Sequence, residues 1–146
     1  MMPYPPLGTL YAGSYLRKRR ISVELHDVML AEQEEEILPV LDRLHPRILA
    51  LCDDGFNFLS KMCLSRMREA AFKLTALAKS RGCKVVIASS DAADHLDNYF
   101  AHGADYVVCG EAEVTLADLA EALLGRSSRP IDQMQGLAFL RGGKIA

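Results

Sequence analysis

Three short apolar runs, each followed by a polar or glycine-containing loop and then by a helical pattern, constrain the fold most strongly. The runs are Ile48–Cys52, Val85–Ala88 and Tyr106–Val108. Apolar runs without polar alternation are typical of strands that are covered on both faces, as in a parallel sheet. Parallel neighbours also require a long connection, usually a helix. The alternation therefore predicts an α/β fold with right-handed crossovers.

Helical periodicity fills the segments around these runs. Apolar residues recur at helical spacing over Leu7–Arg19, Ala31–Leu44 and about Ser60–Arg81. Pro39 is expected to disturb the middle of the second of these helices.

Two further helices are predicted from their capping residues. Asp91 is expected to cap a helix that runs to about His102, and Thr115 to cap the helix Leu116–Leu124.

Two further segments are predicted to form strands. Ile21–Asp27 alternates between apolar and polar residues, which predicts a strand with one polar face near an edge of the sheet. Gly136–Ala146 is predicted to form a hairpin that turns at Gly142-Gly143.

Together these elements predict a Rossmann-like (flavodoxin-like) doubly wound parallel sheet in a three-layer αβα arrangement, with a C-terminal hairpin. Residues 1–125 are expected to form this α/β domain, and residues 126–146 a linker and the hairpin. A helix comes first, whereas folds of this kind normally open with a central strand.

Composition excludes several classes of function. The 146 residues carry a net charge of −2, which favours neither nucleic acid nor an anionic membrane as a partner. No apolar run approaches 18 residues and no signal peptide is evident, so the expected location is cytoplasmic. The four cysteines lack the spacing of a zinc or iron–sulfur motif and are expected to be small core residues.

The stretch Tyr106–Thr115 carries the strongest functional signal from the residues alone. Its apolar strand ends at Gly110, and Glu111 and Glu113 follow before the predicted helix. These carboxylates are therefore expected at the carboxyl edge of the sheet, where open α/β folds bind ligands.

Three segments together resemble a known family: Pro3–Tyr11 (P-Y-P-P-L-G-T-L-Y), Val23–Asp27, and Gly103–Leu116 (G-A-D-x-V-V-x-G-E-x-E-x-T-L). They look like the N-terminal cobalamin-binding domain of B12-dependent radical SAM enzymes. The resemblance covers nearly the whole chain, and residues 136–139 look like the segment that leads toward the radical SAM barrel.

The resemblance implies that a base-off corrinoid lies over the carboxyl edge, with its nucleotide tail between the strand ends. It also implies that a complete enzyme would carry a methyl group on cobalt between S-adenosylmethionine and substrate. The implied cofactor-binding residues are Leu7, Gly8, Asp53, Asp54, Phe56, Asn57, Ser89, Ser90, Asp91, Gly110, Glu111, Glu113 and Thr115.

The sequence departs from the family in several respects. The strand that precedes P-Y-P-P-L-G is missing, and so is the barrel with its three cluster cysteines. The chain is therefore expected to hold no iron–sulfur cluster, to cleave no S-adenosylmethionine alone, and to work with a barrel in cis or in trans. The D-x-H-x-x-G loop of mutase-type domains is absent, and Ser89-Ser90 stand where many related domains have two glycines.

Expectations about ligands and partners follow from these departures. The four histidines fall on predicted strands or helices away from the ring-facing loops, so no protein imidazole is expected on cobalt. The missing strand would leave an open apolar edge beside Ile48–Leu51 unless the neighbouring strands pair directly, and a homodimer is expected to cover the gap.

Two alternative functions stay open at this point. A cofactor-free interaction or scaffolding domain would explain the missing strand. A receiver-like signalling module would use Asp53-Asp54 as a phospho-acceptor site with Mg²⁺, but Gly110-Glu111 follows the last strand where such modules have a lysine. Co-elution of the protein with added hydroxocobalamin would separate the cofactor-binding function from the first alternative.

Overall fold

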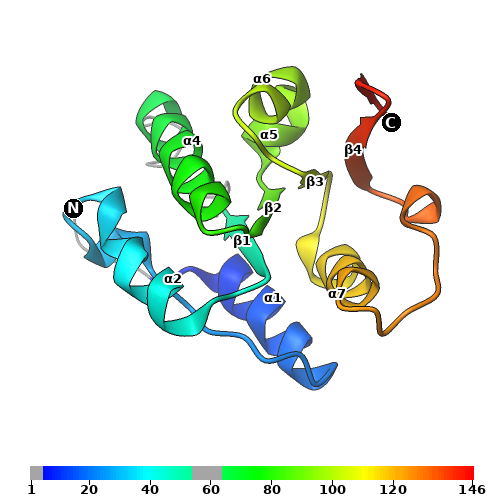
Figure 1. Ribbon diagram of the computed structural model, residues 1–146, viewed down its shortest axis with the longest axis horizontal. Coiled ribbons are helices and arrows are strands. Elements are labelled where there is room, and N and C mark those ends of the chain that lie inside the picture. Colours follow the sequence, from blue (N-terminus) through cyan, green and yellow to red (C-terminus); the bar gives the residue numbers. More distant parts are fainter. Residues whose placement is uncertain (1–4, 54–63) are drawn as a thin grey trace.

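The computed structural model describes residues 5–53 and 64–146, which form one sheet with helices on both faces (Figure 1). The strands are β1 (Ile48–Cys52), β2 (Lys84–Ala88), β3 (Tyr106–Val108), β4 (Leu137–Arg141) and β5 (Lys144–Ile145), paired in that order. The α-helices are α1 (Leu7–Lys18), α2 (Leu38–Leu44), α4 (Leu64–Ser80), α5 (Ser90–Asp94), α6 (Leu96–Ala101) and α7 (Ala112–Leu123). Short 3-10 turns are η1 (Val28–Leu30), η2 (Glu34–Ile37) and η3 (Ile131–Gln133).

The first three strands are parallel, and the register places Ala50 beside Val86 and Val86 beside Tyr106. β4 then pairs antiparallel with β3, and β5 pairs antiparallel with β4. The predicted α/β Rossmann-like fold is confirmed, and the predicted hairpin extends the same sheet. Gly142 and Gly143 form its turn with positive φ, as the sequence predicted.

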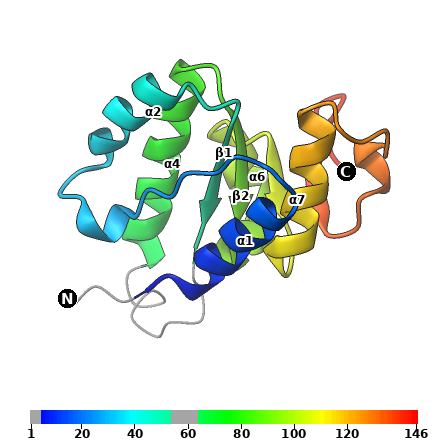
Figure 2. The ribbon, with the colours of Figure 1, turned by 90° about the horizontal axis from the view of Figure 1, so that it is seen from below.

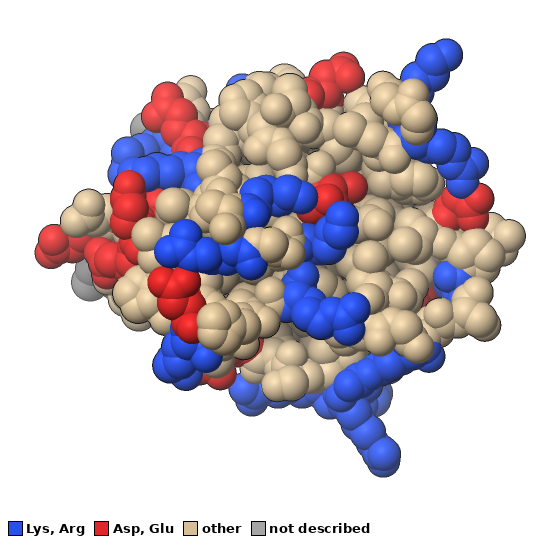
Figure 3. Space-filling view, in the orientation of Figure 1, with Lys and Arg blue, Asp and Glu red and all other residues tan. Residues whose placement is uncertain are grey.

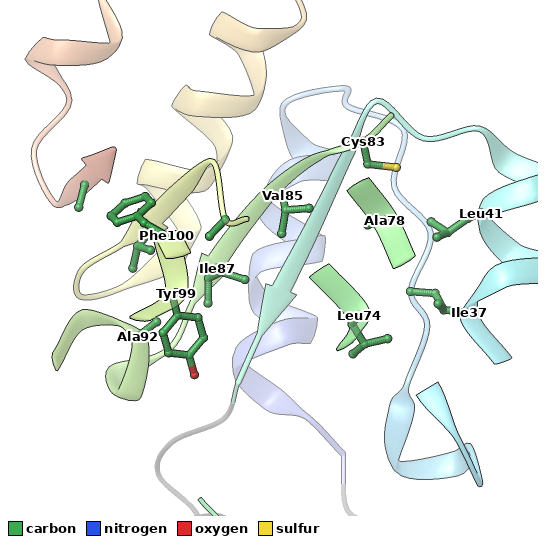
Figure 4. Close-up of a cluster of buried hydrophobic side chains, with 13 residues drawn as sticks. Ile37, Leu41, Leu74, Ala78, Cys83, Val85, Ile87, Ala92, Tyr99 and Phe100 are labelled. Carbon is green, nitrogen blue, oxygen red and sulfur yellow. The ribbon is translucent and has the colours of Figure 1, made fainter. Parts of the chain in front are cut away.

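Two apolar cores lie on opposite faces of the sheet. One is formed by α2, α4, α5 and α6 over Val85, Ile87 and Val107 (Figure 4). The other is formed by α1 and α7 over Val86 and Val108. Because successive side chains of a strand point to opposite faces, the uninterrupted apolar run of β2 supplies both cores at once.

The predicted strand Ile21–Asp27 is wrong, because the structure has an extended segment there that pairs with no described strand. Ile21 is buried in the core under α1 and α7, and Val23 packs against that core. The apolar half of the alternation is thus satisfied by packing, not by strand pairing. The segment crosses in front of β1 instead of lying alongside it (Figure 2).

The predicted helix Ala31–Leu44 is shorter than expected and begins with a 3-10 turn. Gln33 and Glu36 form a capping box at the start of η2, and α2 follows only from Leu38. Pro39 lies in the first turn of α2, where the missing N–H costs no helical hydrogen bond, so it does not disturb the middle of a helix.

Two predicted helix caps are also wrong. Ser89, not Asp91, caps α5, because its hydroxyl accepts the N–H of Ala92 at 3.4 Å. Helix α7 begins four residues earlier than predicted, after Glu111, so Thr115 lies inside it. A break at His95 separates α5 from α6 within the single helix that was expected.

The helix predicted from about Ser60 begins outside the described residues, and its described part is α4. In residues 5–53 and 64–146, no helix is long and apolar enough to span a bilayer.

Gly136 holds the junction between β3 and β4. Its carbonyl accepts the N–H of Cys109 at 2.7 Å, its φ is +71°, and an added Cβ would lie 2.9 Å from the carbonyl oxygen of Cys109. Both the backbone conformation and the close approach therefore require glycine.

We expect Gly136→Ala to lower the free energy of unfolding by about 2 kcal/mol or more, because left-handed strain and a steric clash act together. Gly125→Ala is the matched control, since Gly125 has φ +72° but open space around its Cα. Urea unfolding should show a loss of only about 1 kcal/mol for the control. Equal losses in both variants would contradict a role for the close approach.

Candidate functional site

The carboxyl edge of the parallel strands is formed by the ends of β1, β2 and β3 and by the first turns of α1 and α7. Figure 2 shows both first turns at the end toward which β1 points. Open α/β sheets bind ligands at this edge because the loops there are not needed to hold the strands together.

Helix α1 is held at this edge by contacts at both of its ends. The hydroxyl of Thr9 donates to the carbonyl of Cys52 at 3.5 Å, which ties the first turn of α1 to the end of β1. At the other end, the guanidinium of Arg19 pairs with Glu121 and Asp118 of α7. These contacts fix the two helices side by side over one face of the sheet.

Three exposed apolar side chains lie at the start of the two helices, Leu7 and Tyr11 one turn apart on α1 and Val114 in the first turn of α7, and together they are called the apolar platform. Their exposed fractions are 58%, 66% and 53%, high values for large apolar side chains. Gly8 lies in the first turn of α1, and Gly110 lies in the loop before α7. A Cβ added at either glycine would meet no atom within 4 Å, apart from its neighbours along the chain. The platform therefore combines apolar side chains with backbone that a flat ligand can approach closely.

Polar groups line the edge next to this platform. The hydroxyl of Ser89 donates to the carboxylate of Asp53 at 3.5 Å, which joins the loops after β2 and β1. Burial, together with a smaller effect of the Glu113 carboxylate, raises the pKa of the Cys52 thiol to about 11. The raised pKa keeps the Cys52 thiol protonated near neutral pH.

Asp91 belongs to a different arrangement from the one the sequence predicted. Its carboxylate accepts two hydrogen bonds from the guanidinium of Arg68, at 2.8 and 2.5 Å, and one from the hydroxyl of Tyr99 at 2.8 Å. The Arg68 guanidinium holds the pKa of Asp91 below its usual range, and the Tyr99 bond lowers it further. Burial, with Asp91 as hydrogen-bond partner, raises the pKa of Tyr99. This network joins α4, α5 and α6 and is structural.

A cavity of about 300 Å³ opens beside the carboxyl half of β1. Its walls come from β1, from the inner side of α4, from the first turn of α1 and from residues 25–29. The residues that matter below are Thr9, Ala50, Cys52, Asp53, Leu25 and Met29.

His26 also lines this cavity, and the sequence analysis missed it. The expected strand at Ile21–Asp27 would have kept His26 away from the edge, and no local sequence signal distinguishes the observed path.

The structure brings together only part of the predicted set of site residues. Leu7, Gly8, Asp53, Ser89, Gly110 and Glu113 lie at the carboxyl edge, whereas Asp91 points into the network with Arg68. Ser90 and Glu111 are exposed next to this group, and Thr115 turns to the carbonyl of Gln135 at 3.4 Å. Asp54, Phe56 and Asn57 lie outside the described residues.

The opposite edge of the sheet is basic. Figure 3 views this amino edge and shows Lys and Arg side chains gathered over its middle. Lys79 and Lys84 pair there with Asp105, and Arg47 donates to the carbonyl of Leu123 at the end of α7. These cations complement carboxylates and helix C-termini, so the positive charge is used for structure.

Within residues 5–53 and 64–146, no group of three or more His, Cys, Asp and Glu side chains is arranged to hold a metal ion.

The fold is similar to part of a known enzyme. The radical S-adenosylmethionine methyltransferase TsrM from Kitasatospora setae, solved with tryptophan substrate and a SAM analogue, matches 98% of this chain with a TM-score of 0.74 and 16% identity. This chain spans only 27% of TsrM, and at this identity the likeness shows a shared fold. The N-terminal domain of the hypothetical protein TM0182 from Thermotoga maritima matches 86% of this chain and 89% of its own length, at 20% identity. Its TM-score of 0.47 supports no conclusion.

No protein-family model matches the sequence, and no curated protein matches it.

We expect Asp91→Asn to lower the free energy of unfolding at pH 7 by roughly 2 kcal/mol, because the buried carboxylate holds charge-assisted hydrogen bonds. The pKa of Asp91 is lowered by folding, so its stabilisation is complete above the unfolded value of about 3.9 and is lost as pH falls through the folded value. The difference between the variant and the parent chain should therefore shrink below about pH 4 in urea titrations.

Asp94→Asn is the control, since Asp94 is an exposed carboxylate on the same helix. It should change stability by less than about 0.5 kcal/mol. A pH-independent loss for Asp91→Asn would contradict the ion-pair explanation.

Proposed function

We propose that this chain is the cobalamin-binding domain of a radical SAM methyltransferase-type enzyme. The family resemblance of Pro3–Tyr11 and Gly103–Leu116 supports this proposal, and so does the fold that the chain shares with part of a radical SAM methyltransferase. The catalytic barrel would be supplied in cis or in trans, so the chain alone is not expected to be an enzyme.

The observation that carries the proposal is the apolar platform with open glycine backbone at the carboxyl edge. A corrin ring presents a broad flat face, which needs apolar contacts over a wide area and no side chain standing between it and the backbone. Leu7, Tyr11 and Val114 supply the contacts, and Gly8 and Gly110 leave the approach open. The residues present therefore fit the cofactor.

In this proposal the ring lies over the platform and its amide side chains meet the polar edge. Ser89, Asp53 and Glu113 would accept or donate hydrogen bonds there, and the nucleotide tail would enter between the ends of β2 and β3, next to Gly110. Cobalamin bound in this way would supply a cobalt centre that can carry a methyl group.

We expect the purified chain to bind hydroxocobalamin, and Gly8→Leu to weaken binding at least tenfold by placing a side chain under the ring. The substitution meets no neighbouring atom and replaces glycine in a helix, so it should not destabilise the fold. Equilibrium dialysis with absorbance detection measures the dissociation constant.

Gly13→Leu is the matched control, because Gly13 lies in the same helix with equally open surroundings but outside its first turn. It should change the dissociation constant by less than about twofold. Absence of binding by the parent chain, or equal losses in both variants, would refute the site.

Bound cobalamin should carry no protein imidazole on cobalt. His45 and His102 lie at helix ends and His95 lies beside Asp91, at 3.7 Å from its carboxylate. His26 is the histidine to test, since it lines the cavity at the carboxyl half of β1. EPR of the Co(II) form should show no nitrogen splitting from histidine, and a splitting that disappears in His26→Ala would identify His26 as a ligand and contradict the expectation.

A further inference from the structure

Among the strands of residues 5–53 and 64–146, β1 lies at one edge of the sheet, and its outer hydrogen-bonding groups can be identified from its pairing with β2. The carbonyl of Arg47 accepts the N–H of Lys84, and the N–H of Asp53 donates to the carbonyl of Ala88. In a parallel pair, alternate residues direct both backbone groups to the same neighbour. Residues 47, 49, 51 and 53 therefore face β2, and Ile48, Ala50 and Cys52 face outward.

These outward groups have few partners in the part of the chain that the structure describes. No strand among residues 5–53 and 64–146 pairs with this side of β1. From the described residues, the carbonyl of Cys52 accepts a long bond of 3.5 Å from the hydroxyl of Thr9. An edge of this kind is a template for another extended segment.

The cavity lies directly beside this edge. Ala50 and Cys52 form its inner wall, Met67, Ala71 and Leu74 of α4 form a second wall, and Leu25 and Met29 lie across from β1. Its volume of about 300 Å³ and mostly apolar lining suit a short stretch of apolar chain. The outward backbone groups of Ala50 and Cys52 therefore lie next to the cavity.

Exposed apolar side chains surround the opening. Leu25, Val28 and Met29 are 49%, 44% and 40% exposed, and all three line the cavity. A cluster of exposed apolar residues around a cavity is typical of a surface that another molecule covers.

We propose that this slot binds a short extended peptide segment of apolar residues, which adds to β1 as a further strand by pairing with Ala50 and Cys52. Main-chain hydrogen bonds would give the affinity, and side chains that contact α4 and residues 25–29 would give the specificity. This proposal does not require cobalamin, whose ring would lie over Leu7, Tyr11 and Val114, although the first turn of α1 and Asp53 border both places.

The walls of the slot decide what kind of occupant fits. The edge of β1 is flanked by α4, by the first turn of α1 and by residues 25–29, so the same edge of a second copy, which carries the same flanking elements, fits less well than a single extended segment. Such a segment has no packed layers of its own. Asp27, Asp53 and Asp91 line the slot together with Arg68, which pairs with Asp91. The charged lining of the described slot is therefore net negative, which favours a lysine or arginine on the segment.

The test uses the full chain, labelled with ¹⁵N, and a peptide with the sequence of residues 84–89, capped at both ends and flanked by lysines. This sequence contains the strand that already pairs with β1 on its other side. Peptide binding should slow amide hydrogen exchange at Ala50 and Cys52 at least tenfold. Leu49 and Leu51 are internal controls, because their N–H groups face β2 and should be protected with or without peptide.

Two matched comparisons distinguish strand pairing from non-specific hydrophobic binding. A peptide N-methylated at alternate positions keeps its side chains but loses the pairing donors, and it should bind at least tenfold more weakly. Met29→Lys should weaken binding of the unmodified peptide at least fivefold. Leu30→Lys should not, because Leu30 is 71% exposed and does not line the slot.

Results of three kinds would overturn the proposal. The first is no change in exchange at Ala50 and Cys52 with 1 mM peptide, or equal binding of the N-methylated peptide. The second is a dimer, measured by light scattering, in which the amide of Ala50 is already protected, because a second copy would then be the occupant. The third is protection of the Ala50 amide by hydroxocobalamin that also displaces the peptide, because the slot would then belong to the cofactor.

Discussion

Burial of β2 on both faces is the constraint on which the rest of the structure depends. Val85, Val86 and Ile87 are almost completely removed from solvent, and each contributes about 1.5–3 kcal/mol by leaving water. Side chains that alternate between two faces require a helical layer on each face, because either layer alone would leave half of the strand in water. The position of α4 on one face and of α1 and α7 on the other follows from this requirement.

The same constraint creates the candidate site. Parallel strands that are covered on both faces direct all their carboxyl ends to one edge, where the chain must turn back into a helix. The first turns of α1 and α7 lie at that edge, and Arg19 with its two carboxylate partners holds the same two helices together toward their opposite ends. The position of Leu7, Tyr11 and Val114 therefore follows from the way the helices pack on the sheet. Because these apolar side chains stay exposed there, they suggest a ligand.

The two ends of the sheet differ in how they are finished. Beyond β3 the hairpin β4–β5 continues the ladder, so the backbone groups of β3 are paired on both sides. Beyond β1 no described strand follows, and a cavity with an exposed apolar rim takes that place. An exposed strand edge beside a cavity is a hazard for a protein, because its unpaired backbone groups can pair with another chain. A binding site formed by this strand edge and the cavity would explain why the edge is left exposed.

The sequence by itself determined the α/β class, the three parallel strands, the hairpin at Gly142-Gly143 and the edge at which Gly110 and Glu113 lie. These features depend on local patterns, namely uninterrupted apolar runs, helical periodicity and turn glycines, which keep their meaning in any context. Only the tertiary structure decided the path of Ile21–Asp27, because packing satisfied its apolar residues without strand pairing. It also decided the role of Asp91, since a carboxylate near a helix start can cap the helix or pair with a distant cation. Arg68 lies 23 residues away, and no local pattern relates two residues across such a separation.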